Sequence, residues 1–176
     1  MTTWQFSTKD ARQIDVRHAR VEDAKDLHEN FCNVVSEAEW LPTMRPNSNR
    51  SEWAEWIQRT QTNREVLLIA FIGGSYSGHL SLQPEEWAAA RHVARLGIIV
   101  KKEYRNIGVG RALMLVAEDA GREHHYDKIV LSTFESNTIA RALYHSLGYR
   151  LVGHRQKHFL MPKGYIDEIL MEKLIV

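Results

Sequence analysis

The sequence predicts an α/β fold in which short apolar strands alternate with four amphipathic helices. Three observations indicate this class: the apolar runs are of strand length, helical periodicity separates them, and a glycine-bearing turn joins one strand directly to a helix. The chain has 176 residues, enough for a buried core. It contains no repeat, low-complexity tract or linker, so residues 1–176 are expected to form a single domain.

The first half of the chain contains both the alternation that is typical of strands and the spacing that is typical of helices. The prolines of the segment 40–49 should end one helix. Asn49 followed by Glu52 resembles a capping box that begins the next one. The predicted elements are a strand at 14–17, a helix over 21–35, a loop at 40–49, a second helix that aligns Trp53, Trp56, Ile57 and Thr60, a buried strand at 66–72, a hairpin turn at 73–78 and a strand at 79–82.

The second half alternates strand and helix more regularly. Asn137 is suited to cap a helix, and Gly148 is suited to end it in the left-handed conformation. The predicted elements are a strand at 93–100, a helix with Val109, Ala112, Leu113, Val116 and Ala120 on one face, a strand at 128–133, a helix at 137–147, a strand near Leu151 and a final strand at about 165–174.

Composition excludes several classes of protein. A net charge of +1 gives no electrostatic basis for binding nucleic acid or a membrane surface. The sequence has neither a transmembrane run nor a signal peptide, so a cytoplasmic location is expected. Cys32 is the single cysteine, which rules out an intrachain disulfide. No metal is predicted, because His124–His125 and His154-x-x-x-His158 do not converge with a third ligand.

The turn that follows the strand at 93–100 has the features of an anion-binding site. Glycine allows close approach of the backbone, the free amides of a helix N-terminus point at the ligand, and the helix dipole favours its negative charge. Two arginines flank the turn. We therefore predict that a diphosphate-bearing ligand is bound by Arg105, Asn106, Ile107, Gly108, Val109, Gly110 and Arg111.

Two common phosphate-binding motifs fit this turn poorly. A P-loop has a lysine and a serine or threonine after its last glycine, where this chain has Arg111 and Ala112. A dinucleotide fingerprint requires a third glycine at the position of Leu113. A nucleotide-binding protein of either kind is therefore not expected.

Two segments together resemble the GCN5-related N-acetyltransferases (GNAT). Arg105, Gly108 and Gly110 match the family pattern Arg/Gln-x-x-Gly-x-Gly/Ala of the acetyl-CoA pyrophosphate loop. Residues 137–149 resemble the second signature, an Asn followed by a helix that carries Ala and Tyr and ends in Leu-Gly-Phe/Tyr. The two segments occur in the family's order with one strand between them, and the resemblance extends over roughly the whole chain.

The resemblance implies a mixed central sheet of about seven strands flanked by four helices. In the family, two central parallel strands splay apart and the cofactor's pantetheine lies between them; here these would be 93–100 and 128–133. The backbone of Ile98, Ile99 and Val100 would then bind pantetheine, and Asn137 would contact the cofactor beside its role as a cap. Acetyl-CoA is the implied acyl donor.

The implied reaction is direct attack of a primary amine on the thioester. The amine has to lose a proton, and the departing thiolate needs one. Tyr144 matches the position of the family's general acid, although a packed core aromatic is the alternative interpretation. The acceptor would be a small amine, an amino-acid-like molecule or a peptide or protein N-terminus; the segment 165–171 loosely resembles members that acetylate amino acids, their analogues or polyamines. A CoA-binding sensor or regulatory domain without turnover is the alternative function, and a homodimer is left open.

The general base is not identified by the sequence. Relatives that acetylate protein N-termini carry a Glu where this chain has Ser132, and Glu135 is expected to face solvent. In the family, the first two helices and their connecting loop wall the acceptor site, so the loop at 40–49 would shape the substrate pocket here. We therefore expect deprotonation through water or by a residue on this acceptor side. The other candidates are His79, Glu85, Glu86, His92, Asp167 and Glu168.

Overall fold

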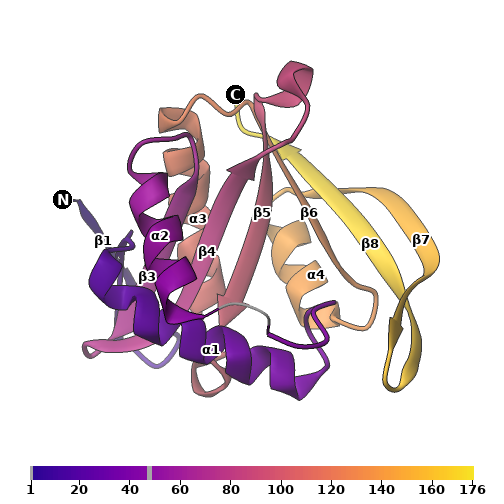
Figure 1. Ribbon diagram of the computed structural model, residues 1–176, viewed down its shortest axis with the longest axis horizontal. Coiled ribbons are helices and arrows are strands. Elements are labelled where there is room, and N and C mark those ends of the chain that lie inside the picture. The colour runs from indigo at the N-terminus through magenta and orange to yellow at the C-terminus, as the bar shows by residue number, and fades with distance from the viewer. Residues whose placement is uncertain (1, 47–48) are drawn as a thin grey trace.

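A computed structural model describes residues 2–46 and 49–176 of the protein and shows one mixed sheet with helices on both faces (Figure 1). The strand order is β1-β2-β3-β4-β5-β6-β8-β7. The strands and α-helices are β1 (Thr3–Ser7), β2 (Gln13–His18), α1 (Ala24–Glu37), α2 (Arg50–Thr60), β3 (Val66–Ile72), β4 (Ser75–Pro84), β5 (Val93–Val100), α3 (Val109–Glu123), β6 (Lys128–Phe134), α4 (Thr138–Ser146), β7 (Arg150–Met161) and β8 (Gly164–Leu174). Short 3₁₀ turns lie at η1 (Val21–Asp23), η2 (Ala88–Ala90) and η3 (Lys102–Tyr104).

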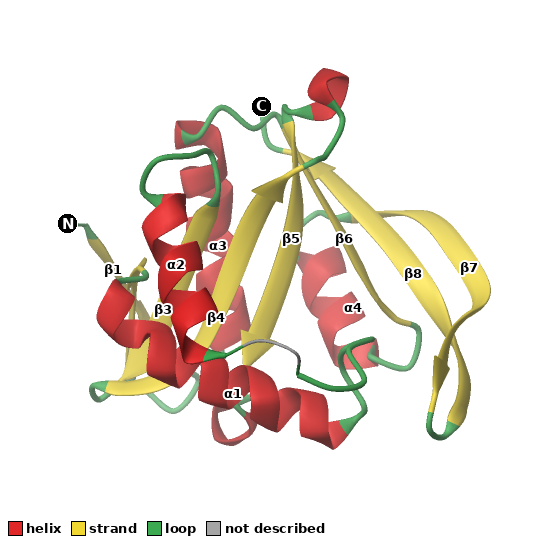
Figure 2. Ribbon diagram, viewed as in Figure 1, coloured by secondary structure: helices red, strands yellow, loops and turns green. Residues whose placement is uncertain are grey.

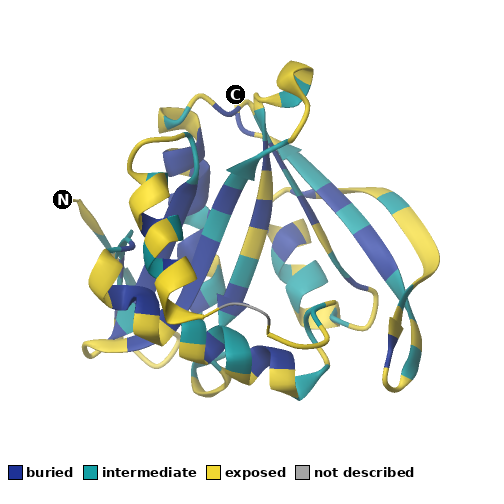
Figure 3. Ribbon diagram, in the orientation of Figure 1, coloured by how far each residue is buried: buried dark blue, intermediate teal, exposed yellow. Residues whose placement is uncertain are grey.

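The helices divide between the two faces of the sheet, so the protein has two apolar cores (Figure 2). Helices α3 and α4 pack on one face, where Leu80, Leu96 and Leu113 are buried together. Helices α1 and α2 pack on the other face, around Leu27 and Ile57. Burial is concentrated in the central strands and in the helix sides that face them, as expected for amphipathic helices on a sheet (Figure 3).

The two central parallel strands pair over a short stretch only. Their register runs from Val93 opposite Lys128 to Arg95 opposite Val130 and then stops. Beyond that point β5 continues along β4 as far as Val100, and β6 continues along β8 as far as Phe134. The strands therefore diverge, as Figure 1 shows, and the predicted splay is confirmed.

Most predicted elements are confirmed, but the sheet has eight strands and not about seven. The additional strand is β1, which pairs antiparallel with β2. The capping box is present, since the Asn49 Oδ1 accepts from the Glu52 amide at 3.1 Å and the Asn49 amide donates to a Glu52 carboxylate oxygen at 3.3 Å. The part of the predicted loop at Asn47 and Ser48 lies outside the described residues.

Two predicted strand boundaries were wrong. The hairpin turn is confined to Gly73 and Gly74, both at positive φ, so the residues after them already belong to β4. Strand β7 runs to Met161, much further than the predicted strand near Leu151. Of the helices in the described ranges, none is long and apolar enough to cross a membrane.

The close approach of β4 to β5 gives a test of the fold. A Cβ added at Gly78 would lie 2.8 Å from the Ile99 carbonyl oxygen, which is backbone and cannot rotate away. We expect Gly78→Ala to lower the free energy of unfolding by roughly 2 kcal/mol or more. Gly97→Ala is the matched control, because its Cβ meets the Ser81 hydroxyl at 3.3 Å and that side chain can turn. Urea unfolding of both variants measures the difference; equal losses would contradict the expected contact.

Candidate active site

The open edge of β5 can be assigned residue by residue from its pairing with β4. The Lys101 amide donates to the Ser77 carbonyl, and the Glu85 amide donates to the Val93 carbonyl. Because backbone groups alternate sides along a strand and the register between these points is regular, Ile99 also bonds to β4. Ile98 and Val100 therefore turn their backbone groups toward the gap.

This alternation changes one part of the predicted cofactor site. Ile98 turns its amide and carbonyl to the side away from β4, where β6 no longer pairs with it. Val100 turns its amide to the same side, and its carbonyl accepts from Arg105 Nε at 3.1 Å. The backbone of Ile99 faces β4, so only its side chain is available, and it lies on the α1–α2 face beside His79. The sequence could not resolve this alternation without the register.

The turn at 105–111 has the backbone shape expected for an anion site. Asn106 and Gly108 both have positive φ, 65° and 117°, and α3 begins directly after them. The first helical bond runs from the Ala112 amide to the Gly108 carbonyl at 3.0 Å. The amides of Val109, Gly110 and Arg111 have no carbonyl one turn earlier in the helix, so they are the free donors of its N-terminus.

The two flanking arginines are held in different ways. Arg111 is exposed, and its Nη1 lies 3.2 Å from the Ser146 hydroxyl at the end of α4. Arg105 makes a bidentate pair with Glu37, with both N–O distances at 2.7 Å. The predicted cationic flank is thus present at Arg111, whereas the Arg105 side chain is committed to α1 and not to the loop amides.

Helix α4 places the second predicted motif beside the splay. Asn137 caps it through Oδ1, which accepts from the Ala140 amide at 3.2 Å, and Gly148 has a φ of 88°, so both local predictions are confirmed. Tyr144 is buried, with its ring centroid 6.2 Å from that of Tyr149. Burial raises the pKa of Tyr144 to about 12, which keeps the phenol protonated at neutral pH.

His79 lies on the acceptor-side face of β4 within a buried polar chain. Asn30 Nδ2 donates to Tyr76 Oη at 3.0 Å, and Tyr76 Oη lies 2.6 Å from His79 Nδ1. Burial raises the pKa of Tyr76, so the hydroxyl stays protonated. Because its oxygen already accepts from Asn30, we assign its hydrogen to the bond with His79 Nδ1. Burial also lowers the pKa of His79 to about 4, and the neutral ring then carries its hydrogen on Nε2. This tautomer leaves no free lone pair for a general base.

The carboxylates considered as bases are paired or distant. Glu168 is buried and lies 2.9 Å from Arg155 Nη1 and 3.3 Å from His158 Nε2. Glu85 and Glu86 sit near Arg95 at the closed end of the two strands. His92 also lies there, since its carbonyl accepts from the Asp127 and Lys128 amides at the start of β6. Ser132 is exposed on β6 opposite Leu170.

A group of possible metal ligands that the sequence did not bring together lies where β6 meets α4. Glu135, His154 and Asp167 have ligand atoms within 4.8 Å of one another. Asp167 already accepts from His154 Nε2 at 2.7 Å and from the Lys157 amide at 2.6 Å. Both hydrogen bonds lower the pKa of Asp167; the bond from the Lys157 amide has the larger effect and the bond from His154 the next. These two hydrogen bonds join Asp167 on β8 to β7, so this contact needs no cation to explain it.

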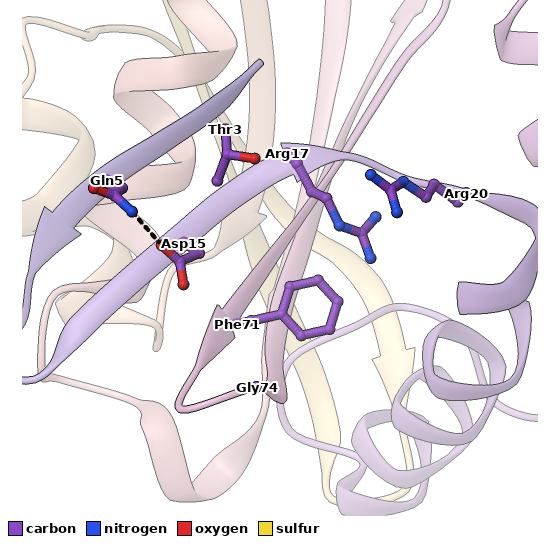
Figure 4. A pocket seen from close by; sticks show the side chains of 7 residues that line it. All are labelled: Thr3, Gln5, Asp15, Arg17, Arg20, Phe71 and Gly74. Atoms are coloured by element: carbon purple, nitrogen blue, oxygen red, sulfur yellow. Dashed lines mark hydrogen bonds between the residues drawn. The ribbon is translucent and has the colours of Figure 1, made fainter. Parts of the chain in front are cut away.

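A cavity of about 500 Å³ lies on the far part of the sheet, over β1, β2 and β3 (Figure 4). Arg17 there is held by Asp23 at 2.7 and 2.9 Å and stacks over the Phe71 ring. The Gln5 amide donates to Asp15 at 3.2 Å, as the figure marks. None of the predicted site residues lines this cavity, so we assign the site to the splay.

Comparison with known proteins shows the family of this chain. The model of the acetyltransferase (GNAT) family matches residues 33–149, which include both motifs. The chain therefore belongs to this family and is an acetyl-CoA-dependent N-acetyltransferase. A sensor or regulatory domain without turnover, the alternative from the sequence, is set aside.

The similar proteins span almost the full chain. The L-amino acid N-acetyltransferase AaaT of Escherichia coli is 27% identical over 169 residues, which are 92% of this chain and 98% of that protein. The spermidine N(1)-acetyltransferase of Thermoplasma acidophilum is 22% identical over 161 residues, which are 86% of this chain and 98% of that protein. The structure of yncA from Salmonella typhimurium with its cofactor acetyl-CoA has a TM-score of 0.87 and 17% identity. The match covers 93% of this chain and 94% of that one, which shows the shared fold.

The buried histidine predicts a pH dependence of stability. An unfolded histidine has a pKa of about 6.5, while His79 in the folded protein has one of about 4. The unfolded chain binds the extra proton between these values, so stability falls by roughly 3 kcal/mol as the pH drops through this window. His79→Gln keeps an acceptor for Tyr76 and removes this titration. Urea unfolding between pH 4.5 and 7.5 should give a flatter pH dependence in the variant; parallel curves would contradict the assignment.

Proposed function

We propose that this acetyltransferase modifies the primary amine of a small molecule, an amino acid or a related amine, by direct attack on the thioester. The observation that carries the proposal is the end of β5–β6 pairing at Arg95 and Val130, because it leaves strand-edge backbone groups to which an extended ligand arm can bond. The relatives named above act on L-amino acids and on spermidine, both of which carry primary amines. Ser132, in place of the Glu of the N-terminal acetyltransferases, disfavours a peptide N-terminus as acceptor.

In the proposed complex, residues 1–176 act as one domain that holds acetyl-CoA across the splay. The backbone of Ile98 and Val100 pairs with pantetheine, and the Ile99 side chain faces the acceptor. The pyrophosphate sits on the free amides of the loop. The proposed cofactor-binding residues are Ile98, Ile99, Val100, Arg105, Asn106, Ile107, Gly108, Val109, Gly110, Arg111, Asn137 and Tyr144. Arg105 is included for its backbone in the loop, because its side chain is held by Glu37.

Tyr144 is proposed to stabilise the departing thiolate by donating a hydrogen bond. A complete proton transfer from a phenol of pKa about 12 to a thiolate whose thiol has a pKa of about 8.5 is uphill by roughly 5 kcal/mol. The phenol therefore stays neutral while its O–H bonds to the sulfur, and water supplies the final proton. Deprotonation of the amine is likewise assigned to water, since His79 Nδ1 is occupied and Glu168 is paired.

A screen of acceptors tests the proposed function. L-amino acids, spermidine and short peptides are each incubated with acetyl-CoA, and both thiol release and the acetylated product are measured. We expect thiol release to depend on a small amine and to match the acetylated amine in amount. Thiol release without an acetylated product would indicate hydrolysis, and products from peptides alone would overturn the proposed acceptor class.

The position of the pyrophosphate is tested at Gly110. A Cβ there would lie 3.3 Å from Leu143 Cδ2 and within 3.9 Å of the Val100 and Ile98 side chains. Gly110→Asp puts a carboxylate beside the amides that should bind phosphate, so we expect CoA affinity to fall more than about 100-fold. Gly110→Ala adds the same Cβ without charge and should retain more of the affinity. Calorimetry measures the CoA affinity of both variants. Unchanged CoA binding by the Asp variant would mean that the pyrophosphate binds elsewhere.

The role of Tyr144 is tested by removing its hydroxyl. We expect Tyr144→Phe to lower kcat about 100-fold while the affinity for CoA changes little, because ring packing is kept. Tyr149→Phe is the matched control: its buried hydroxyl has no hydrogen-bond partner among the described residues, so its loss should leave turnover nearly unchanged. Steady-state kinetics of both variants decide the role, and equal turnover in wild type and Tyr144→Phe would make Tyr144 a packing residue.

A further inference from the structure

The pairing of Arg105 with Glu37 joins the donor side of the site to the helix that precedes the acceptor-side loop. Both carboxylate oxygens of Glu37 lie 2.7 Å from the guanidinium of Arg105, 68 positions later in the chain. Their side chains are only 20% and 23% exposed, so the pair is partly shielded from water. The hydrogen bonds from Arg105, as the largest cause, lower the pKa of Glu37 and keep it ionised.

The same two side chains fix one group on each side of the splay. On the donor side, Arg105 Nε donates to the Val100 carbonyl at 3.1 Å, the last carbonyl of the open strand edge. On the acceptor side, Trp40 Nε1 donates to Glu37 Oε2 at 2.7 Å, and its ring lies under the Arg105 guanidinium at 5.3 Å. Three of the five N–H donors of Arg105 thus bond to Val100 and Glu37.

We propose that Glu37 is a positioning residue for acetyl transfer, acting through Arg105 on Val100 and through its own carboxylate on Trp40. The Glu37–Arg105 pair holds the end of the open strand in a fixed relation to the loop after α1. An attacking amine held by that loop is then kept in line with a thioester held by β5, which is the geometry that direct attack requires. This proposal rests on the proposed function for the assignment of the donor and acceptor sides, whereas the Glu37–Arg105 contact is observed in the structure.

Kinetics of single and double variants test the proposal. We expect Glu37→Gln and Arg105→Gln each to lower kcat/KM for the acceptor about 10-fold or more, while the CoA dissociation constant stays within about 3-fold of wild type. The double variant should be no worse than the more severe single one, because the two residues act as a unit. Additive losses, or an unaffected kcat/KM, would overturn the proposal.

Two comparisons separate positioning from other roles. Asp23→Asn removes the other bidentate pair, that with Arg17 at 2.7 and 2.9 Å, and should lower the melting temperature while leaving kcat/KM within about 2-fold. If Asp23→Asn lowers kcat/KM as much as Glu37→Gln does, the effect is general destabilisation and the proposal fails. A loss of CoA affinity above about 10-fold in Arg105→Gln alone would make Arg105 a phosphate ligand and would also overturn it.

A readout without any acceptor separates this proposal from the proposed function. The Lys101 nitrogen and the Val100 carbonyl belong to the same peptide group. The ¹H–¹⁵N resonance of Lys101 therefore reports the hydrogen bond that this carbonyl accepts from Arg105. We expect the same displaced Lys101 peak in Glu37→Gln, Arg105→Gln and the double variant, even if no amine in the screen is acetylated. A Lys101 peak that stays in place in Glu37→Gln would overturn the positioning role whatever the acceptor proves to be.

Discussion

The site depends on a hydrogen-bonded ladder that stops after three residue pairs. Strands β5 and β6 run in parallel and start as ordinary neighbours, but each is pulled to a different partner, β4 on one side and β8 on the other. Unpaired backbone groups within a protein cost free energy unless something bonds to them. A strand edge left open between two otherwise paired halves of a sheet is therefore a polar surface that an extended ligand with amide groups can complete.

Among the candidate residues around the opening, a hydrogen-bond donor is easier to identify than a base. Tyr144 is neutral because burial disfavours its anion, which suits a group that only donates a hydrogen bond. His79 is a candidate base by residue type, but in the tautomer assigned from the Asn30–Tyr76 chain its Nδ1 accepts from Tyr76 and its hydrogen is on Nε2. The proposed chemistry is thereby asymmetric: a side chain would assist departure of the thiolate, and loss of the amine's proton would depend on solvent.

Sequence reasoning identified the parts of the fold that carry local signals. Asn137 and Gly148 mark the ends of one helix by their own backbone preferences, and the structure has both as expected. Strand β1 was missed because it has only five residues, too few for the alternation of Trp4 and Phe6 with polar residues to stand out; it pairs with β2. The extension of β7 was missed for a similar reason, since the segment 154–158 is polar throughout and has no alternating pattern.

The site was predictable in its motifs but not in its contacts. The sequence led to a prediction of the backbone segments that bind the cofactor, whereas the direction of each peptide group required the register with β4. The partner of Arg105 lies 68 positions away at the end of another helix, and no local pattern indicates such a pairing. Long-range ion pairs and strand alternation depend on tertiary packing, which is the information that a single sequence conveys least directly.

The two edges of the sheet have a consequence for behaviour at high protein concentration. Strand β1 is short, and β7 carries charges such as Arg155 and Lys157 together with two irregularities in its register. Lys157 also has a φ of 50°, which interrupts the extended backbone of the edge. Short strands, charges and bulges all hinder the addition of a strand from another molecule. The internal edge can thus remain open for a ligand while the outer edges resist intermolecular β-pairing and aggregation.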